Sequence, residues 1–179
     1  MNSALKSQFL VAVPQLVGPF FTKSVVLILD NDDEGSTGII LNHPTEHTLS
    51  EINESLKSSR RKKDRLFIGG PVEPSAAIII HDDTYQGPDT KPITDGVAWS
   101  ASLESMQVMA ESESLPFRCF LGYAGWTSKQ LEAEIAKGSW LLNPMNPEMI
   151  YTHQPENMWK TVLNEMGLDP LSIGPGAFD

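Results

Sequence analysis

The sequence predicts a single α/β domain, and three observations support this fold class. The chain has 179 residues, which is the size of one ordinary domain. Its first part contains short apolar segments rich in β-branched residues and separated by turn residues, as is typical of strands. Its later part alternates such segments with amphipathic helical patterns. Strands mixed with helices predict a mixed sheet with helices packed against it.

Eight segments have the continuous apolar runs or the alternation expected of strands. They are residues 8–13, 24–30, 38–41, 66–68, 76–81, 97–99, 117–122 and 139–142. Residues 31–37, rich in Asp and Gly, join the second and third segments, which predicts a hairpin.

Four helices are predicted from capping residues and apolar spacing. One begins at Thr48, where Glu51 completes a capping box, and the others cover 102–111, 128–137 and the segment from Pro155 to Gly167. Two segments, 57–65 and 82–96, carry no signal for regular structure. We expect these two segments to be mobile loops.

The segment 122–135 (GYAGWTSKQLEAEI) contains the most specific local pattern. Thr127 is predicted as the N-cap of the helix, with Gln130 three residues later. Trp126 and Leu131 have the spacing of a hydrophobic staple across that helix start. The pattern predicts a rigid strand-to-helix turn.

Three blocks in order resemble the AlgH/YqgE family of small bacterial proteins. They are residues 9–44, residues 69–72 (GGPV), and the block GYAGW…QLEAEI…GSWL. The resemblance implies one domain, residues 1–168, with its sheet curled into a partial barrel and helices at its flanks. It also implies a suspected link to transcriptional regulation, and no established biochemical activity. Residues 169–179 lack periodicity and are expected to form a loose tail.

Composition indicates an acidic cytoplasmic protein. Cys119 is the single cysteine, so no internal disulfide can form, which fits a reducing compartment. The apolar stretch 9–21 is interrupted by Pro14, Gly18 and Pro19, which argues against a signal peptide. No segment has the length of apolar residues that a membrane span requires, so we expect no membrane contact.

The formal net charge is −10, but the cations are concentrated in one place. Residues 57–65 (KSSRRKKDR) hold six of the 13 Lys and Arg residues and one of the 23 acids, which leaves 7 cations and 22 acids, a balance of −15, on the rest. The candidate partner-binding residues in this basic segment are Arg60, Arg61, Lys62, Lys63 and Arg65. The segment is a solvated loop, a contact for an acidic protein partner or a second copy, or a nucleic-acid contact. The acidic body and the lack of interleaved aromatic residues argue against direct DNA binding.

No motif for a metal, a cofactor or covalent catalysis is complete. Residues 30–35 imitate the first half of a calcium loop, but Leu41 stands where a bidentate Glu is required. His43 and His47 are separated by Pro44, and the run from His81 to Asp83 has no third ligand. Cys119 lies on the predicted inward face of a strand without a base beside it. We therefore expect no metal, no cofactor and no catalytic residue.

A ligand site is expected where the family's glycine motif meets the Trp126 turn. Its candidate residues are Asn42, Gly69, Gly70, Pro71, Tyr123, Trp126 and Gln130. Paired glycines let the backbone approach a ligand closely, although packing against another strand also explains them. The direction of the Glu134 side chain is left open by the sequence.

The favoured function is a non-enzymatic regulatory protein that binds a partner or a small ligand. The alternative is an enzyme that acts on a small polar substrate in a cleft between residues 69–71 and 123–126. A titratable side chain that shares this cleft would favour the enzyme.

Overall fold

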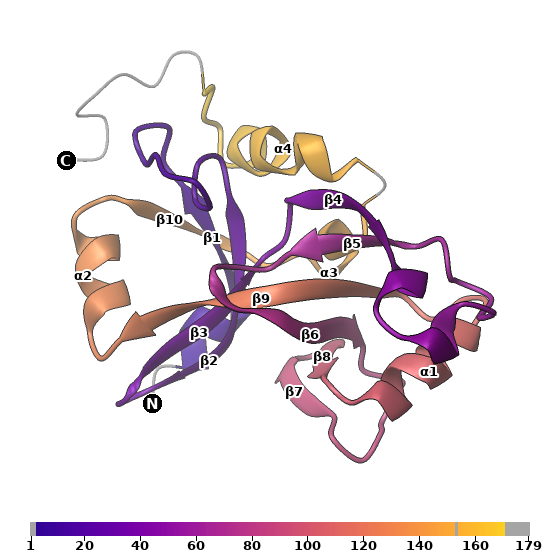
Figure 1. Cartoon of the computed structure of the whole chain (residues 1–179). Coiled ribbons are helices and arrows are strands. Elements are labelled where there is room, and N and C mark those ends of the chain that lie inside the picture. Colours follow the sequence, from indigo (N-terminus) through magenta and orange to yellow (C-terminus); the bar gives the residue numbers. More distant parts are fainter. Residues whose placement is uncertain (1–2, 153, 171–179) are drawn as a thin grey trace.

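The computed structural model describes residues 3–152 and 154–170 (Figure 1). The strands are β1 (Gln8–Ala12), β2 (Val25–Asp32), β3 (Gly35–Ile40), β4 (Pro44–Thr48), β5 (Arg65–Ile68), β6 (Val72–Asp82), β7 (Lys91–Thr94), β8 (Val97–Ser100), β9 (Phe117–Thr127) and β10 (Trp140–Pro144). The α-helices are α1 (Leu103–Glu111), α2 (Gln130–Ala136), α3 (Pro147–Ile150) and α4 (Met158–Glu165). The 3₁₀ turns are η1 (Ser3–Ser7), η2 (Leu49–Glu51), η3 (Glu54–Leu56) and η4 (Pro155–Asn157).

Strand β9 crosses the middle of the molecule and joins the two parts of the sheet (Figure 1). Its first half lies between β5, which is parallel to it, and β6, which is antiparallel. Its second half pairs with β3, where Ala124 lies opposite Gly38. The strand order is β10-β1-β2-β3-β9-β6-β8-β7, and β4 extends the sheet beside β5. The sheet is strongly curled into a half-barrel, and the predicted α/β fold class with a curled mixed sheet is confirmed.

Strands β1 to β3 are buried on both faces, which explains their continuous apolar runs. On β2, Val25 and Leu27 join one core cluster while Val26 and Ile28 join a second on the opposite face. The alternation follows from the two-residue repeat of a strand. A third cluster lies under α1, where Met106 and Met109 are buried.

The helices cover different parts of the sheet (Figure 1). Helix α4 buries Trp159, Val162 and Leu163, and Trp159 Nε1 donates a hydrogen bond to the carbonyl of Ala12 at 2.8 Å. Helix α2 packs Leu131 into the same cluster as Trp126. The helix predicted at 102–111 is confirmed as α1.

Several predicted elements differ from the structure. Strands β4 and β7 and helix α3 were not predicted, since β4 is largely polar and β7 contains Pro92. The helix predicted from Thr48 is instead the two short turns η2 and η3, although Thr48 N–H donates to Glu51 Oε2 at 2.6 Å as the capping box requires. The predicted hairpin is confirmed as β2–β3.

The predicted start of the helix after β9 is wrong by two residues. Strand β9 continues through Thr127, and α2 begins at Gln130 with Lys129 as its N-cap in the left-handed conformation (φ 64°). The reason is that Thr127 still pairs with Gly35 of β3, so the strand continues through it, while Gln130 Oε1 accepts the predicted hydrogen bond from Thr127 N–H at 3.0 Å.

Within residues 3–152 and 154–170, no helix is long and apolar enough to cross a membrane. Most of the predicted tail, from residue 171 on, lies outside the described residues.

Candidate functional site

The glycines of the predicted ligand site lie against the backbone of β9. A Cβ atom on Gly69 would stand 2.3 Å from the carbonyl oxygen of Gly122, and one on Gly70 would stand 2.1 Å from the carbonyl carbon of Tyr123. Gly69 N–H also donates to the carbonyl of Leu121 at 2.8 Å. These glycines therefore allow two strand ends to approach closely, which is the packing explanation of the motif. Pro71, next to them, is exposed.

Asn42 is buried and holds two neighbouring segments together. Its Oδ1 accepts a hydrogen bond from Val25 N–H at 3.0 Å, and its Nδ2 donates to the carbonyl of Lys23 at 2.9 Å. Its amide is thus bonded within the chain, and its proposed role as a polar anchor for a ligand stays a prediction.

Trp126 and Gln130 are likewise engaged by their own chain. The indole Nε1 of Trp126 donates to Glu134 Oε2 at 2.8 Å, and Trp140 Nε1 donates to the same oxygen at 3.0 Å. Gln130 Nε2 donates to the other oxygen of Glu134 at 3.2 Å. The Glu134 side chain therefore points toward two tryptophans. Neither of the two cavities described below is lined by the seven predicted ligand residues.

The basic segment, residues 57–65, is fixed to the body by backbone hydrogen bonds, which differs from the expected mobile loop. Arg61 N–H donates to the carbonyl of Ala110 on α1 at 2.9 Å. The carbonyl of Lys62 accepts from Ser50 N–H at 3.0 Å. The other predicted loop, 82–96, contains β7. The cations of the basic segment are therefore displayed on an ordered scaffold.

In the basic segment, Arg65 Nη2 lies 3.3 Å from Glu156 Oε1, and the other two arginines also have acidic partners close by. Arg60 contacts the Glu113 carboxylate at 2.6 Å, with both side chains largely exposed. Arg61 Nε lies 2.8 Å from Asp64 Oδ2, and its Cζ lies 3.9 Å from the ring centroid of Phe117. These contacts direct the guanidinium groups of Arg60 and Arg61 toward the body.

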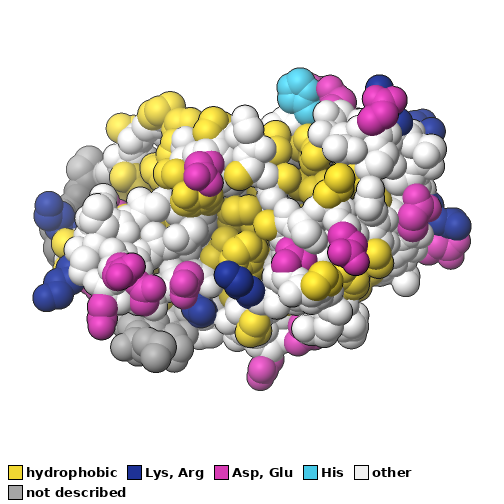
Figure 2. Space-filling model, turned by 60° about the horizontal axis from the view of Figure 1, so that its bottom comes forward, with side chains coloured by type: hydrophobic (Ala, Val, Ile, Leu, Met, Phe, Trp, Pro, Cys, Tyr) yellow, Lys and Arg dark blue, Asp and Glu magenta, His cyan; other side chains and the backbone are white. Residues whose placement is uncertain are grey.

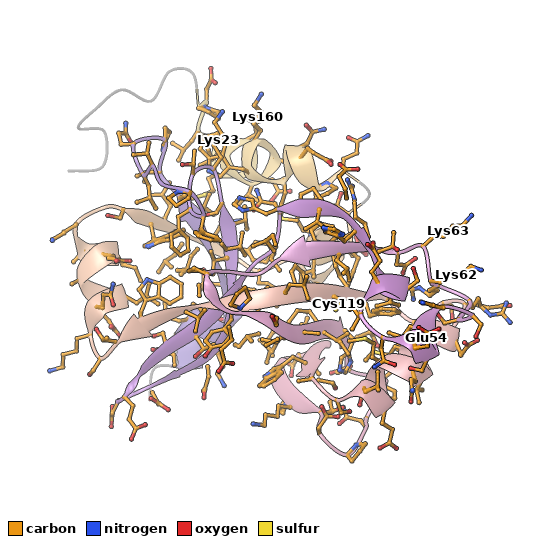
Figure 3. The ribbon with its side chains drawn as sticks, viewed as in Figure 1. Lys23, Glu54, Lys62, Lys63, Cys119 and Lys160 are labelled. Carbon is orange, nitrogen blue, oxygen red and sulfur yellow. The ribbon has the colours of Figure 1, made fainter. Side chains whose placement is uncertain are left out.

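Lys62 and Lys63 instead project from the edge of the molecule (Figure 3). Both are exposed, and in the part of the chain that the structure describes no acidic group lies within 4.0 Å of either ammonium group. Nearby Glu54 is bound by Lys57 at 2.7 Å. A shallow hollow of about 640 Å³ lies between these side chains.

Beside the basic segment lies a cleft of about 760 Å³, which we call the arginine cleft. It is lined by Leu49, Arg60, Arg61, Asp64, Arg65, Phe67, Glu113, Ser114, Leu115, Pro116, Phe117, Arg118, Cys119, Tyr151 and Pro155. The basic segment, the start of β9 and the residue after α3 thus meet at one place. The sequence predicted the basic segment but not Arg118 or Tyr151.

Arg118 is the cation at the inner wall of the arginine cleft. Its Nη1 donates to the carbonyl of Ile150 at 3.0 Å and its Nη2 to the carbonyl of Thr152 at 2.9 Å. Burial, and secondarily the charge of Arg65, lowers the pKa of Arg118 from its usual 12.5 to about 10. The guanidinium remains charged at neutral pH, but its charged form is disfavoured by its surroundings.

Cys119 lines the same cleft but is 3% exposed. Burial raises the pKa of its thiol to about 12, so the thiolate is not populated at neutral pH. The thiol is therefore a structural group, as its position among apolar residues predicted.

The described histidines do not gather into a metal site. His81 is fully buried, with Nδ1 2.9 Å from the carbonyl of Asp82 and Nε2 2.8 Å from Ser100 Oγ. His47 Nδ1 lies 3.1 Å from Glu51 Oε1 in an exposed pair. Among residues 3–152 and 154–170, no three His, Cys, Asp or Glu side chains are placed to hold one ion.

Comparison with known proteins shows what this architecture resembles. The family model described as AlgH-like matches residues 9–171. A UPF0301 protein of Myxococcus xanthus is 37% identical over 170 residues, with 93% of each chain covered, and one of Methylococcus capsulatus is 32% identical, with 90% of this chain and 91% of that protein covered. The solution structure of the AlgH protein from Pseudomonas aeruginosa superimposes with a TM-score of 0.79 at 27% identity, covering 96% of this chain and 95% of that one. The chain therefore belongs to the AlgH-like family of bacterial proteins.

Proposed function

We propose that this protein is a non-catalytic cytoplasmic protein that acts in regulation by binding an acidic protein partner through the basic segment. The observation that supports this most is the pair Lys62 and Lys63. They are exposed and lack an acidic partner in the described chain, yet the backbone beneath them is hydrogen-bonded to the body.

Order in the basic segment favours recognition for an entropic reason. A mobile loop loses conformational freedom when it binds, and that loss weakens association. Here hydrogen bonds to α1 and to Ser50 already fix the loop backbone. Unpaired cations on a fixed scaffold attract acidic surfaces at long range and select partners by charge.

A second copy of the chain is one possible acidic partner. Outside the basic segment the chain carries 22 acids against 7 cations. Figure 2 shows acidic side chains spread over one face of the body. Self-association and binding to another protein therefore use the same charge complementarity, and the experiment below separates them.

The enzyme alternative has less support. The polar groups of Asn42 and Trp126 are hydrogen-bonded within the chain, and Gly69 lies against β9. The regulatory role itself rests on the suspected link of the family to transcriptional regulation.

The test compares two variants with equal charge change. Lys62→Ser/Lys63→Ser removes the outward cations, and the control Lys23→Ser/Lys160→Ser removes two exposed cations beside α4, on another side of the molecule (Figure 3). Partners retained by the wild-type protein are identified, purified and titrated against each variant at low and high salt. Light scattering of each protein alone measures self-association.

The proposal expects the first variant to lose a salt-sensitive association that the control retains. Loss of association in both variants to the same extent would indicate an unspecific effect of net charge and would contradict it. Retention by both at every salt concentration would show that the basic segment is a solvated loop.

A further inference from the structure

The inner wall of the arginine cleft contains a half-buried cation that pairs with no anion among the described residues. Arg118 uses two guanidinium nitrogens for backbone carbonyls, and among the described residues no carboxylate lies within 4.0 Å of it. Carbonyl oxygens solvate a guanidinium but do not neutralise it. A cation withdrawn from water is costly unless an anion accompanies it. An anion bound beside Arg118 would compensate this charge.

The hydroxyl group of Tyr151 is a second polar group in the same cleft whose bonding is unsatisfied. It is buried, and in the part of the chain that the structure describes it has no hydrogen-bond partner. Burial raises the pKa of Tyr151 well above its usual range, so it remains a neutral O–H donor. Unsatisfied buried donors are rare and call for an explanation such as a bound group.

Arg65 and Phe67 complete the wall. Arg118 Cζ lies 4.3 Å from the ring centroid of Phe67, and Arg65 Cζ lies 5.9 Å from the same centroid. Arg65 has one contact with Glu156 at 3.3 Å, and both side chains are about half exposed. Such surface pairs contribute little and can open for a ligand. The ring therefore holds two guanidinium groups toward one space.

We propose that the inner arginine cleft binds the carboxylate of a small organic molecule through Arg118, Arg65 and the hydroxyl of Tyr151. This site uses groups other than Lys62 and Lys63, so it is independent of the partner-binding function proposed above. The apolar side chains of Leu49 and Leu115 also line the cleft and provide contacts for the body of the molecule.

Charge balance selects a carboxylate rather than a phosphate. Arg60, Arg61 and Arg65 each have an acidic partner, whereas Arg118, the fourth arginine of the cleft, has none among the described residues. One uncompensated positive charge matches the single charge of a carboxylate. A phosphate monoester carries close to two charges at neutral pH and would bring its second charge near Asp64 and Glu156.

The test uses the full chain and four probes. Benzoate and hexanoate supply a carboxylate with an apolar body, benzamide is the neutral counterpart of benzoate, and phenyl phosphate carries the alternative anion. Binding is followed by amide proton–nitrogen NMR spectra at constant ionic strength. We expect saturable shifts with benzoate and hexanoate at residues 65–67, 115–119 and 150–152.

Tyr151→Phe is the informative variant, because it removes only the hydroxyl group. Loss of one hydrogen bond to a charged group should weaken benzoate binding about tenfold. The stability of the unliganded protein should stay the same or rise, since a buried unpaired polar group is lost. The matched control Tyr123→Phe removes a hydroxyl outside the cleft, and it should bind benzoate like the wild type.

Four results would overturn the proposal. They are equal binding of benzamide and benzoate, tighter binding of phenyl phosphate than of benzoate, wild-type affinity of Tyr151→Phe for benzoate, and absence of any shift with benzoate and hexanoate. Lys62→Ser/Lys63→Ser should bind benzoate normally, so loss of partner binding in that variant and loss of carboxylate binding in Tyr151→Phe are separate outcomes.

Discussion

The indole Nε1 of Trp126 donates a hydrogen bond to Glu134 Oε2 at 2.8 Å, which fixes the end of β9 to α2. Trp140 at the start of β10 donates to the same oxygen at 3.0 Å, and the two rings are edge to face with centroids 6.2 Å apart. One carboxylate oxygen thus connects two strands through the helix between them. Both indoles are at least 93% buried, with exposures of 7% and 3%.

Replacing Glu134 by Ala should destabilise the protein by about 3 kcal/mol, because two buried indole N–H groups lose a charged acceptor. Glu134→Gln retains an oxygen acceptor and should cost less, about 1 kcal/mol. Urea unfolding measured by tryptophan fluorescence would give both values. Equal losses for the two variants would show that the acceptor is unimportant.

The sequence predicted the burial of Trp126 and Leu131 but not the direction of the Glu134 side chain. The spacing of Trp126 and Leu131 predicted that both are buried at a strand-to-helix turn, because that pattern is local. The direction of Glu134 could not be predicted, since it depends on Trp140, which the sheet brings close through the pairing of β10 with β1.

The arginine cleft was less predictable for the same reason. Its basic segment is a local charge cluster, and so it was found. Arg118 and Tyr151 are 33 residues apart, and α3, which leads into Tyr151, was not predicted. A lone arginine within the apolar segment 117–122 was a usable signal, because a charge in a buried strand needs partners. Its partners are backbone carbonyls, which no sequence pattern encodes.

Gly122 should not tolerate a side chain. Its φ is 73°, and a Cβ atom there would stand 2.4 Å from the carbonyl oxygen of Gly70. Gly122→Ala should cost about 3 kcal/mol or more, since backbone strain and a backbone clash combine. The control is Gly125→Ala, where the nearest atom to a new Cβ is Val72 Cγ2 at 3.9 Å. Thermal unfolding should separate the two variants, and equal melting temperatures would contradict the close approach.

Stability should fall as the pH decreases below about 6.5 because of His81. Burial lowers the pKa of His81 below its usual 6.5, although the nearby Asp82 carbonyl partly opposes this shift. The carbonyl can only accept, so Nδ1 carries the proton and Nε2 accepts from Ser100. The unfolded chain therefore binds a proton more readily than the folded chain does. As the pH falls from 6.5 toward the folded pKa, each such histidine lowers the free energy of unfolding by up to about 1.4 kcal/mol per pH unit.

Burial also lowers the pKa of His43, so it adds to the same slope. Urea midpoints across this pH range would measure the effect. A midpoint that does not change between pH 7 and 5 would contradict the neutral state of His81.

Asp89 should contribute stability that disappears in acid. Burial alone would raise the pKa of Asp89, but hydrogen bonds from Ala101 N–H, the side chains of Ser105 and Ser102, and Ser102 N–H hold it well below its usual 3.8. The contribution is therefore complete above about pH 4 and is lost as pH falls through the folded pKa.

Asp89→Ala should cost about 2 to 3 kcal/mol at neutral pH, because Asp89 fixes the start of α1. Asp95→Ala, at the exposed turn between β7 and β8, is the control and should have little effect. Unfolding at neutral pH and near pH 3 would measure both variants. A loss for Asp89→Ala that is equally large near pH 3 would contradict a role for the charge.

Duplex DNA should bind weakly and without sequence preference at physiological salt. The basic segment offers six cations, but the rest of the chain carries a balance of −15, and acidic side chains are scattered over the face in Figure 2. Phosphate contacts supply most of the non-specific affinity, and the acidic body repels the duplex on either side of one short cationic segment. With a Debye length of about 8 Å, this attraction extends little beyond the segment itself.

Titration of labelled duplexes at about 150 mM salt would test this, and a sub-micromolar, sequence-dependent complex there would contradict the prediction. Weak binding that disappears as salt rises, and that is lost in Lys62→Ser/Lys63→Ser, is the expected result.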